Sequence, residues 1–150
     1  ALVLVTVGSQ WSRRFDAAHV EQFRTAMVRA AQDRMAHSDI KGIDAEALRR
    51  WLAANGGDAG FVLPPQLPDK AIAGCKLVTW QRTRVTMLCF RVDGSHADLF
   101  VLDVARLPGI AREGIQRGVT DGAKTTLWCR ANKFYLLVED KAAPALKRMI

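Results

Sequence analysis

The spacing of apolar residues changes along this chain from a helical period to a strand period near residue 72. Ahead of that point, Val20, Phe23 and Met27 follow one another at intervals of three or four residues, which is the spacing of an amphipathic helix. Beyond it, apolar and polar residues alternate in short runs, as they do in half-buried β-strands. Helices followed by strands predict an α+β domain built on an antiparallel sheet.

Two helices are expected ahead of the sheet. The first covers residues 16–37, with Asp16 as its N-cap. The second covers residues 44–54, with Asp44 as its N-cap and glycines at its end. An aspartate at the N-cap accepts a hydrogen bond from a backbone N–H that has no partner within the helix.

Five strands are expected after the helices, over residues 75–80, 84–92, 96–104, 124–130 and 133–139. Short polar links join neighbouring strands, which is typical of antiparallel hairpins. Apolar side chains occupy both alternating sets of the second strand, so it is predicted to be central and covered on both faces. We therefore expect about five antiparallel strands, with the N-terminal helices packed on one face and a short C-terminal helix over residues 142–149.

Two segments rich in glycine and proline are expected to be connectors. Residues 55–70 contain three glycines and three prolines, which exclude a regular helix or strand. Their apolar run at Phe61-Val62-Leu63 needs burial, so this connector is expected to lie along the body of the domain. Residues 105–123 are expected to cross the edge of the sheet.

The N-terminus begins with seven residues that are apolar except for Thr6, followed by Trp11 and Arg13-Arg14. An interfacial tryptophan followed by basic residues often ends a membrane-spanning helix, and the same apolar residues also suit an edge strand. Seven residues extend only about 10 Å as a helix, too short to span a bilayer. We expect residues 1–14 to be the end of a transmembrane or juxtamembrane segment, and residues 15–150 to form one domain.

The net charge of +7 lies mostly in the second half, because residues 1–65 carry +1 and residues 66–150 carry +6. A basic surface attracts polyanions or simply keeps the protein solvated. The sequence has no run of three basic residues, which argues against a dedicated nucleic-acid module. A nucleic-acid-binding sheet displaying Trp80, Phe90 and Phe100 is a rival, but these aromatics alternate with leucine and valine, as core residues do.

Residues 45–140 resemble the extracytoplasmic part of membrane-anchored bacterial anti-sigma factors. Such domains typically show a Trp-Leu pair on a helix, a proline-rich loop, and strands with recurring apolar and aromatic residues. The matching elements here are Trp51-Leu52, Pro64-Pro65, Gly74-Cys75, Leu88-Cys89-Phe90, Leu99-Phe100-Val101, Leu127-Trp128 and Tyr135-Leu136-Leu137.

The resemblance implies a non-catalytic sensory domain of a transmembrane regulator of transcription. It implies an inner-membrane protein anchored by an N-terminal helix, with this domain facing the periplasm. Its partners would be a sigma factor, bound through an upstream cytoplasmic domain, and a protein or protease on the extracytoplasmic side. It implies no nucleic-acid partner for this domain.

The sequence contains none of the common catalytic motifs, so we expect no enzyme, no catalytic residue and no cofactor. The serines lack a G-x-S-x-G context, and no phosphate-binding glycine pattern is present. Metal-site spacings such as C-x-x-C or H-x-x-H are also absent, and no metal is predicted.

The cysteines leave three interpretations open. An odd-numbered loop after Trp80 would place Cys75 opposite Cys89, close enough for a disulfide. An even loop would separate them as buried free thiols. The third interpretation is a small-molecule, metal or redox sensor in which Cys75, Cys89 and His96 meet on the sheet.

Overall fold

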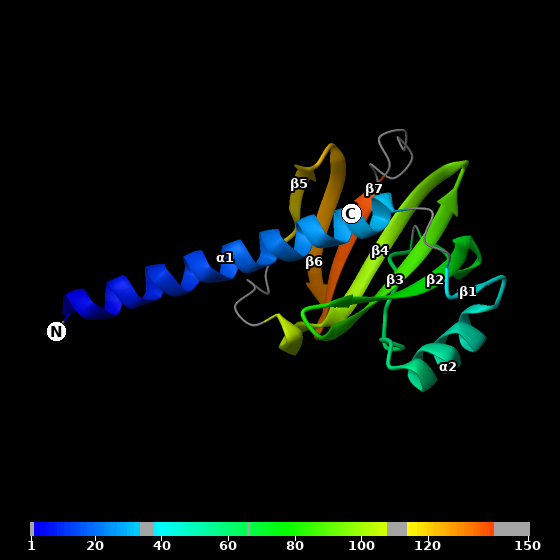
Figure 1. Ribbon diagram of the computed structural model, residues 1–150, viewed down its shortest axis with the longest axis horizontal. Helices are drawn as coiled ribbons and strands as arrows, with labels where there is room; N and C mark the ends of the chain where they lie inside the picture. The colour runs from blue at the N-terminus through cyan, green and yellow to red at the C-terminus, as the bar shows by residue number, and fades with distance from the viewer. Residues whose placement is uncertain (1, 34–37, 66, 108–113, 140–150) are drawn as a thin grey trace.

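The structure is a computed structural model that describes residues 2–33, 38–65, 67–107 and 114–139. A long helix comes first, and a second helix precedes the main run of strands (Figure 1). The elements in this part of the chain are α1 (Leu2–Gln32), β1 (Ile40–Lys41), α2 (Ala45–Asn55), β2 (Ile72–Trp80), β3 (Thr83–Val92), β4 (Ser95–Asp103), β5 (Gln116–Thr120), β6 (Ala123–Arg130) and β7 (Lys133–Glu139), with short 3-10 helices η1 (Asp69–Ala71) and η2 (Val104–Arg106).

The described strands form one seven-stranded antiparallel sheet in the order β1-β2-β3-β4-β7-β6-β5. The α+β class and the antiparallel sheet are confirmed, and each of the five predicted strands is present. The count of five is wrong, because β1 and β5 extend the sheet at its two edges. β1 has only two residues, and β5 lies within residues 105–123, which were expected to be a connection.

The two helices pack on opposite faces of the sheet, so the expectation that both cover one face is wrong. Phe23 and Met27 of α1 belong to a core cluster with Val85 and Phe100. On the other face, Leu48 and Leu52 of α2 belong to a second cluster, which also contains Leu88, Phe90 and Leu99. The central strands are apolar on both faces, as predicted for the second strand, and each face therefore needs its own cover.

α1 is one continuous helix of 31 residues. Residues 2–7 are therefore not an edge strand, and Asp16 lies inside the helix instead of capping it. His19 and Phe23 contact the ring of Trp80 at one end of the sheet, and Gln32 donates to the carbonyl of Asp121 at the other end. The N-terminal half of α1 projects past the Trp80 end of the sheet (Figure 1).

No helix in the described residues has an apolar stretch long enough to cross a membrane. The C-terminal helix expected over residues 142–149 lies outside the described part of the chain.

α2 begins and ends as its sequence predicts. The Asp44 side chain accepts a hydrogen bond from the Ala47 amide at 2.8 Å. Gly56 follows the helix in the left-handed conformation, with φ 73°, which suits a residue without Cβ.

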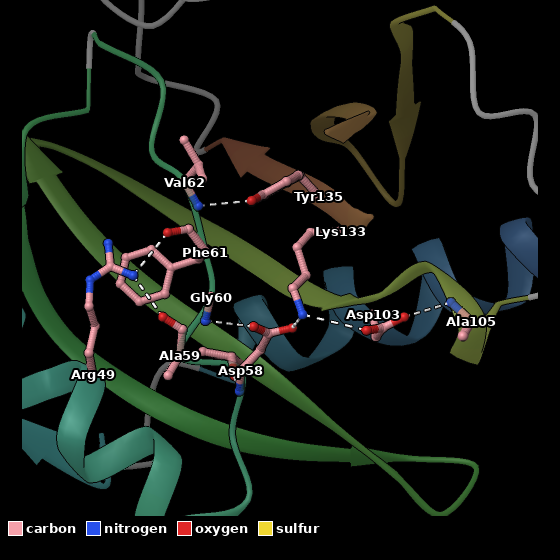
Figure 2. A network of polar contacts seen from close by, with 11 residues as sticks. Arg49, Asp58, Ala59, Gly60, Phe61, Val62, Asp103, Ala105, Lys133 and Tyr135 are labelled. Carbon is pink, nitrogen blue, oxygen red and sulfur yellow. Dashed lines mark hydrogen bonds and ion pairs between the residues drawn. The ribbon is translucent and has the colours of Figure 1, made fainter. Parts of the chain in front are cut away.

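The connector after α2 lies along the domain, as expected, with Phe61 and Leu67 each 1% exposed. Figure 2 shows the polar contacts that hold it in place. Arg49 donates to the carbonyls of Ala59 and Phe61, and the Val62 amide donates to the Tyr135 hydroxyl at 2.9 Å. Asp58 pairs with Lys133 of β7 at 2.8 Å. The connector is therefore part of the folded body.

Candidate functional site

A pocket of about 540 Å³ opens on the α1 face, at the C-terminal end of α1. Its walls come from α1, the short segment around β1, and strands β2, β3 and β4, and most of the side chains that line it are polar or charged. The lining residues are Ala30, Ala31, Asp33, Ser38, Lys41, Ala73, Lys76, Met87, Cys89, Arg91, His96 and Asp98.

The floor of the pocket is set by the β3–β4 hairpin. Its two-residue turn, Asp93-Gly94, has positive φ at both positions, as a type I′ turn requires. This turn fixes the register in which Cys89 lies opposite Asp98 and Arg91 lies opposite His96. The four side chains occur at every second position of their strands, so they share the face that lines the pocket.

Gly74 creates the space for the pocket wall beside Cys89. A Cβ at this position would lie 2.6 Å from the Ser38 hydroxyl oxygen, so a larger residue would push Ser38 away. Ser38 forms a hydrogen bond with Cys89. The segment that carries Ser38 is anchored nearby, because the Asp39 amide donates to the Cys75 carbonyl and the Asp39 carboxylate accepts from the Leu77 amide.

The charges around the pocket suit a small polar ligand. Asp98 is 5% exposed in an otherwise apolar stretch of β4, and three cationic side chains line the same pocket: Lys41, Lys76 and Arg91. Burying a carboxylate is costly unless polar groups compensate it. A ligand that carries hydrogen-bond donors and negative charge would therefore meet both a carboxylate and cations in this pocket.

Cys89 is a neutral thiol in this pocket. Burial, the charge of Asp98 and a hydrogen bond to the Asp98 carboxylate raise the pKa of Cys89 to about 12. Burial, together with the charge of Asp39, raises the pKa of Cys75 to about 12 as well. Thiolates are the nucleophilic and metal-binding form of cysteine, so both side chains are suited to packing and hydrogen bonding.

The cysteines are free thiols, and the geometry required for a Cys75–Cys89 disulfide is not found. The β2–β3 turn has two residues, Gln81-Arg82, and not the odd number that the disulfide needs. This register places Cys75 opposite Leu88 and Cys89 opposite Gly74. The two thiols also lie in different clusters on opposite faces.

The sensor arrangement of Cys75, Cys89 and His96 is only partly present. Cys89 and His96 line the same pocket, whereas Cys75 belongs to the α2 face. Within the described residues, no group of three histidine, cysteine or acidic side chains is placed to hold a metal ion. Cys89 and His96 therefore remain together only as two of the residues that line the polar pocket.

The sequence-based site missed Asp98, Arg91 and Ser38. Asp98 carried a usable signal, because it is a lone carboxylate between Ala97 and Leu99 in an apolar strand. Pairing β3 with β4 across the Asp93-Gly94 turn would have placed it beside Cys89. Ser38 carried no such signal, since only the folded chain brings it over Gly74.

The aromatic residues of the rival nucleic-acid surface are core residues, as their alternation predicted. Phe90 and Phe100 are fully buried. Trp80 packs against His19 and Phe23 of α1, with ring centroids 5.0 and 5.1 Å apart. The sheet therefore does not present these rings as a stacking surface.

Comparison of the chain with protein-family models, curated proteins and solved structures finds no match. The resemblance of residues 45–140 rests on its sequence motifs, most of which occupy the core. Leu52, Cys75, Leu88 and Leu99 are all buried together on the α2 face. The features of the molecule that bear on function are therefore α1 and the pocket.

Proposed function

We propose that this chain is the non-catalytic extracytoplasmic sensory domain of a membrane-anchored anti-sigma factor. In this proposal residues 1–14 lead out of the membrane, and residues 15–150 form the periplasmic domain of an inner-membrane protein. An upstream cytoplasmic domain binds the sigma factor. A signal on the periplasmic side, delivered by a small molecule, a protein or a protease, changes the state of that complex.

The continuity of α1 is the observation that carries the proposal. One helix contains the mostly apolar residues 2–7, Trp11 and Arg13-Arg14, then packs on the sheet and ends at the pocket, which Ala30 and Ala31 line. A helix is a stiff element that transmits displacement along its axis. Ligand binding at its C-terminal end is thereby coupled to the segment that would enter the membrane.

A non-catalytic role is consistent with the chemistry of the pocket. Burial, together with the charge of Asp98, keeps Cys89 as a thiol, so it lacks the activated state of a nucleophile. The polar lining is suited to recognising a ligand without transforming it.

The test uses the full-length protein, expressed with its cognate sigma factor and a sigma-dependent reporter. We expect the protein in the membrane fraction, with this domain digested by protease added to spheroplasts. Replacing Asp98 with Asn should change the reporter response, while Lys70→Gln, at an exposed site outside the pocket, should not. A full-length protein recovered outside the membrane fraction would exclude the proposal.

A second candidate function is a small-molecule-binding domain without a link to transcription, using Cys89 and His96. The observation that favours it is the shared pocket of these two residues. Equilibrium dialysis against pools of small carboxylates and phosphates tests it. Binding that His96→Ala abolishes, in a protein that leaves the sigma-dependent reporter unchanged, would favour this function over the first.

A further inference from the structure

The two ends of the sheet differ in charge. The end with the β2–β3 turn, η2 and the β6–β7 turn is rich in basic residues and is called the basic end. The basic side chains among its described residues are Arg82, Arg84, Arg106, Arg130 and Lys133, and the four arginines are exposed.

The acidic side chains at the basic end, Asp58 and Asp103, share one lysine. Lys133 pairs with Asp58 at 2.8 Å and with Asp103 at 3.5 Å (Figure 2). Arg84 donates to the carbonyl of Asn55. In the described part of the chain no arginine of this end forms a salt bridge with a carboxylate, so their charges are directed to solvent.

At the opposite end, cationic side chains such as Arg91 and Lys124 stand beside acidic ones, so basic residues do not dominate it. Its two hairpin turns are Asp93-Gly94 and Asp121-Gly122, and both aspartates are exposed. Arg29 of α1 approaches Asp121 at 3.9 Å. Among the described residues, the excess of positive charge at the sheet ends therefore lies at the basic end.

The N-terminal half of α1 leaves the domain from the basic end. His19 and Phe23 pack on Trp80 at this end, and Gln32 reaches Asp121 at the other, so the helix direction is fixed (Figure 1). Along the helix axis, Trp11 lies about 12 Å from His19. With Trp11 at a membrane interface, the part of the basic end that contacts His19 would lie within roughly one to two Debye lengths of the lipid surface.

The turn that presents Arg82 is conformationally costly. Gln81 and Arg82 have φ of 45° and 65°, in a type I′ turn that normally favours Asn-Gly. Strain of this kind is often retained where a side chain has a function. Arg82 thus combines a strained backbone conformation with an exposed positive charge.

We propose that the basic end is a membrane-facing surface that binds the headgroups of anionic phospholipids. This inference rests on the proposed function, since it takes the N-terminal end of α1 to lead to the membrane. Lipid is favoured over nucleic acid because the projecting apolar helix and the arginines are on the same side. The aromatic rings that would stack on bases are buried in the core.

The test is co-sedimentation of the 150-residue chain with vesicles of phosphatidylcholine, alone or mixed with phosphatidylglycerol. We expect binding that requires phosphatidylglycerol and weakens with salt. Each arginine removed should lower affinity by about fivefold, so Arg82→Gln/Arg106→Gln is compared with the wild type. The matched control is Lys70→Gln/Lys124→Gln, two lysines away from the basic end, which removes the same charge and should have little effect.

Three outcomes would overturn the inference. The first is an equal loss in both variants, which would indicate a general charge effect. The second is tighter binding to a DNA duplex than to the anionic vesicles, with the same dependence on Arg82 and Arg106. The third is displacement of the vesicles by millimolar inorganic phosphate. Recovery of the full-length protein outside the membrane would instead refute the proposed function, whatever the vesicles show.

Discussion

At the scale of single residues, the protonation state of Cys75 makes stability depend on alkaline pH. Its folded pKa is about 12, against a reference value of 9.0. The folded state therefore favours the neutral thiol, and the stability this confers is complete below pH 9 and is lost as the pH rises toward 12. Urea denaturation should show the free energy of unfolding falling by about 1.4 kcal/mol per pH unit for such a thiol.

The Cys75→Ala variant is the control for that prediction. It removes the titrating group, so its stability should fall less steeply between pH 9 and 11 than that of the wild type. Equal slopes in the two proteins would show that Cys75 titrates normally in the folded state.

Asp58 holds the connector to the sheet through two separable contacts. One carboxylate oxygen accepts from the Gly60 amide at 2.9 Å, and the other pairs with Lys133, whose pKa is raised mainly by that hydrogen bond. Asp58→Asn retains an acceptor for Gly60 and should cost about 1 kcal/mol, whereas Asp58→Ala loses both contacts and should cost about 2 kcal/mol. The exposed control Asp69→Asn should be neutral, and equal losses in the two Asp58 variants would contradict this division.

At the scale of elements, replacing the hairpin turns of the basic end distinguishes their effect on stability from their effect on vesicle binding. Both turns at the basic end, Gln81-Arg82 and Ala131-Asn132, place a residue other than glycine in the left-handed region where the opposite end has Asp-Gly. Replacing either pair with Asn-Gly should stabilise the protein by about 1 kcal/mol. Only the replacement at Gln81-Arg82 should also weaken vesicle binding, because it removes a surface arginine.

Thermal unfolding and vesicle binding measured on both turn variants check this prediction. Similar gains in stability with a loss of binding in one variant are expected. A loss of binding in both variants would indicate that turn rigidity, and not the charge of Arg82, determines the affinity for lipid.

The strands with strong apolar alternation were predictable, and the edge strands were not. Residues 133–139 match β7 in full, because its side chains are buried between two covered faces. β5 is mostly exposed, with Val119 70% exposed. Its sequence therefore lacks the alternation of apolar and polar residues that predicted the other strands. α1 was divided at Asp16 because capping preference is a local signal, whereas packing on the sheet extends the helix through that position.

The pocket was less predictable than the sheet, since it depends on register. A change of one residue in the β2–β3 turn decides whether Cys75 lies opposite Cys89 or Leu88, and so whether the two thiols share a face of the sheet. His96 and Cys89 were identified, but their grouping with Asp98 required the β3–β4 pairing. Ser38 enters the site through tertiary packing alone.

At the scale of the whole molecule, the direction of α1 and the charge of the sheet ends predict one orientation on a membrane. The basic end should lie against the headgroups, and the Asp93 and Asp121 turns should point away. Two exposed residues of β2, Thr79 and Ala73, can be labelled to measure this orientation. Their positions along the strand differ by about 20 Å, with Thr79 nearer the basic end.

A fluorophore on an introduced cysteine at either position measures the orientation. In a background with Cys89→Ala and Cys129→Ala, Thr79→Cys and Ala73→Cys are labelled and bound to phosphatidylglycerol vesicles that carry a quencher on the headgroup. Quenching should be strong at position 79 and weak at position 73, because headgroup quenchers act at short range. Equal quenching would mean that the domain lies flat, with β2 parallel to the surface. Stronger quenching at position 73 would mean that the opposite end faces the lipid, which the charges of Asp93 and Asp121 disfavour.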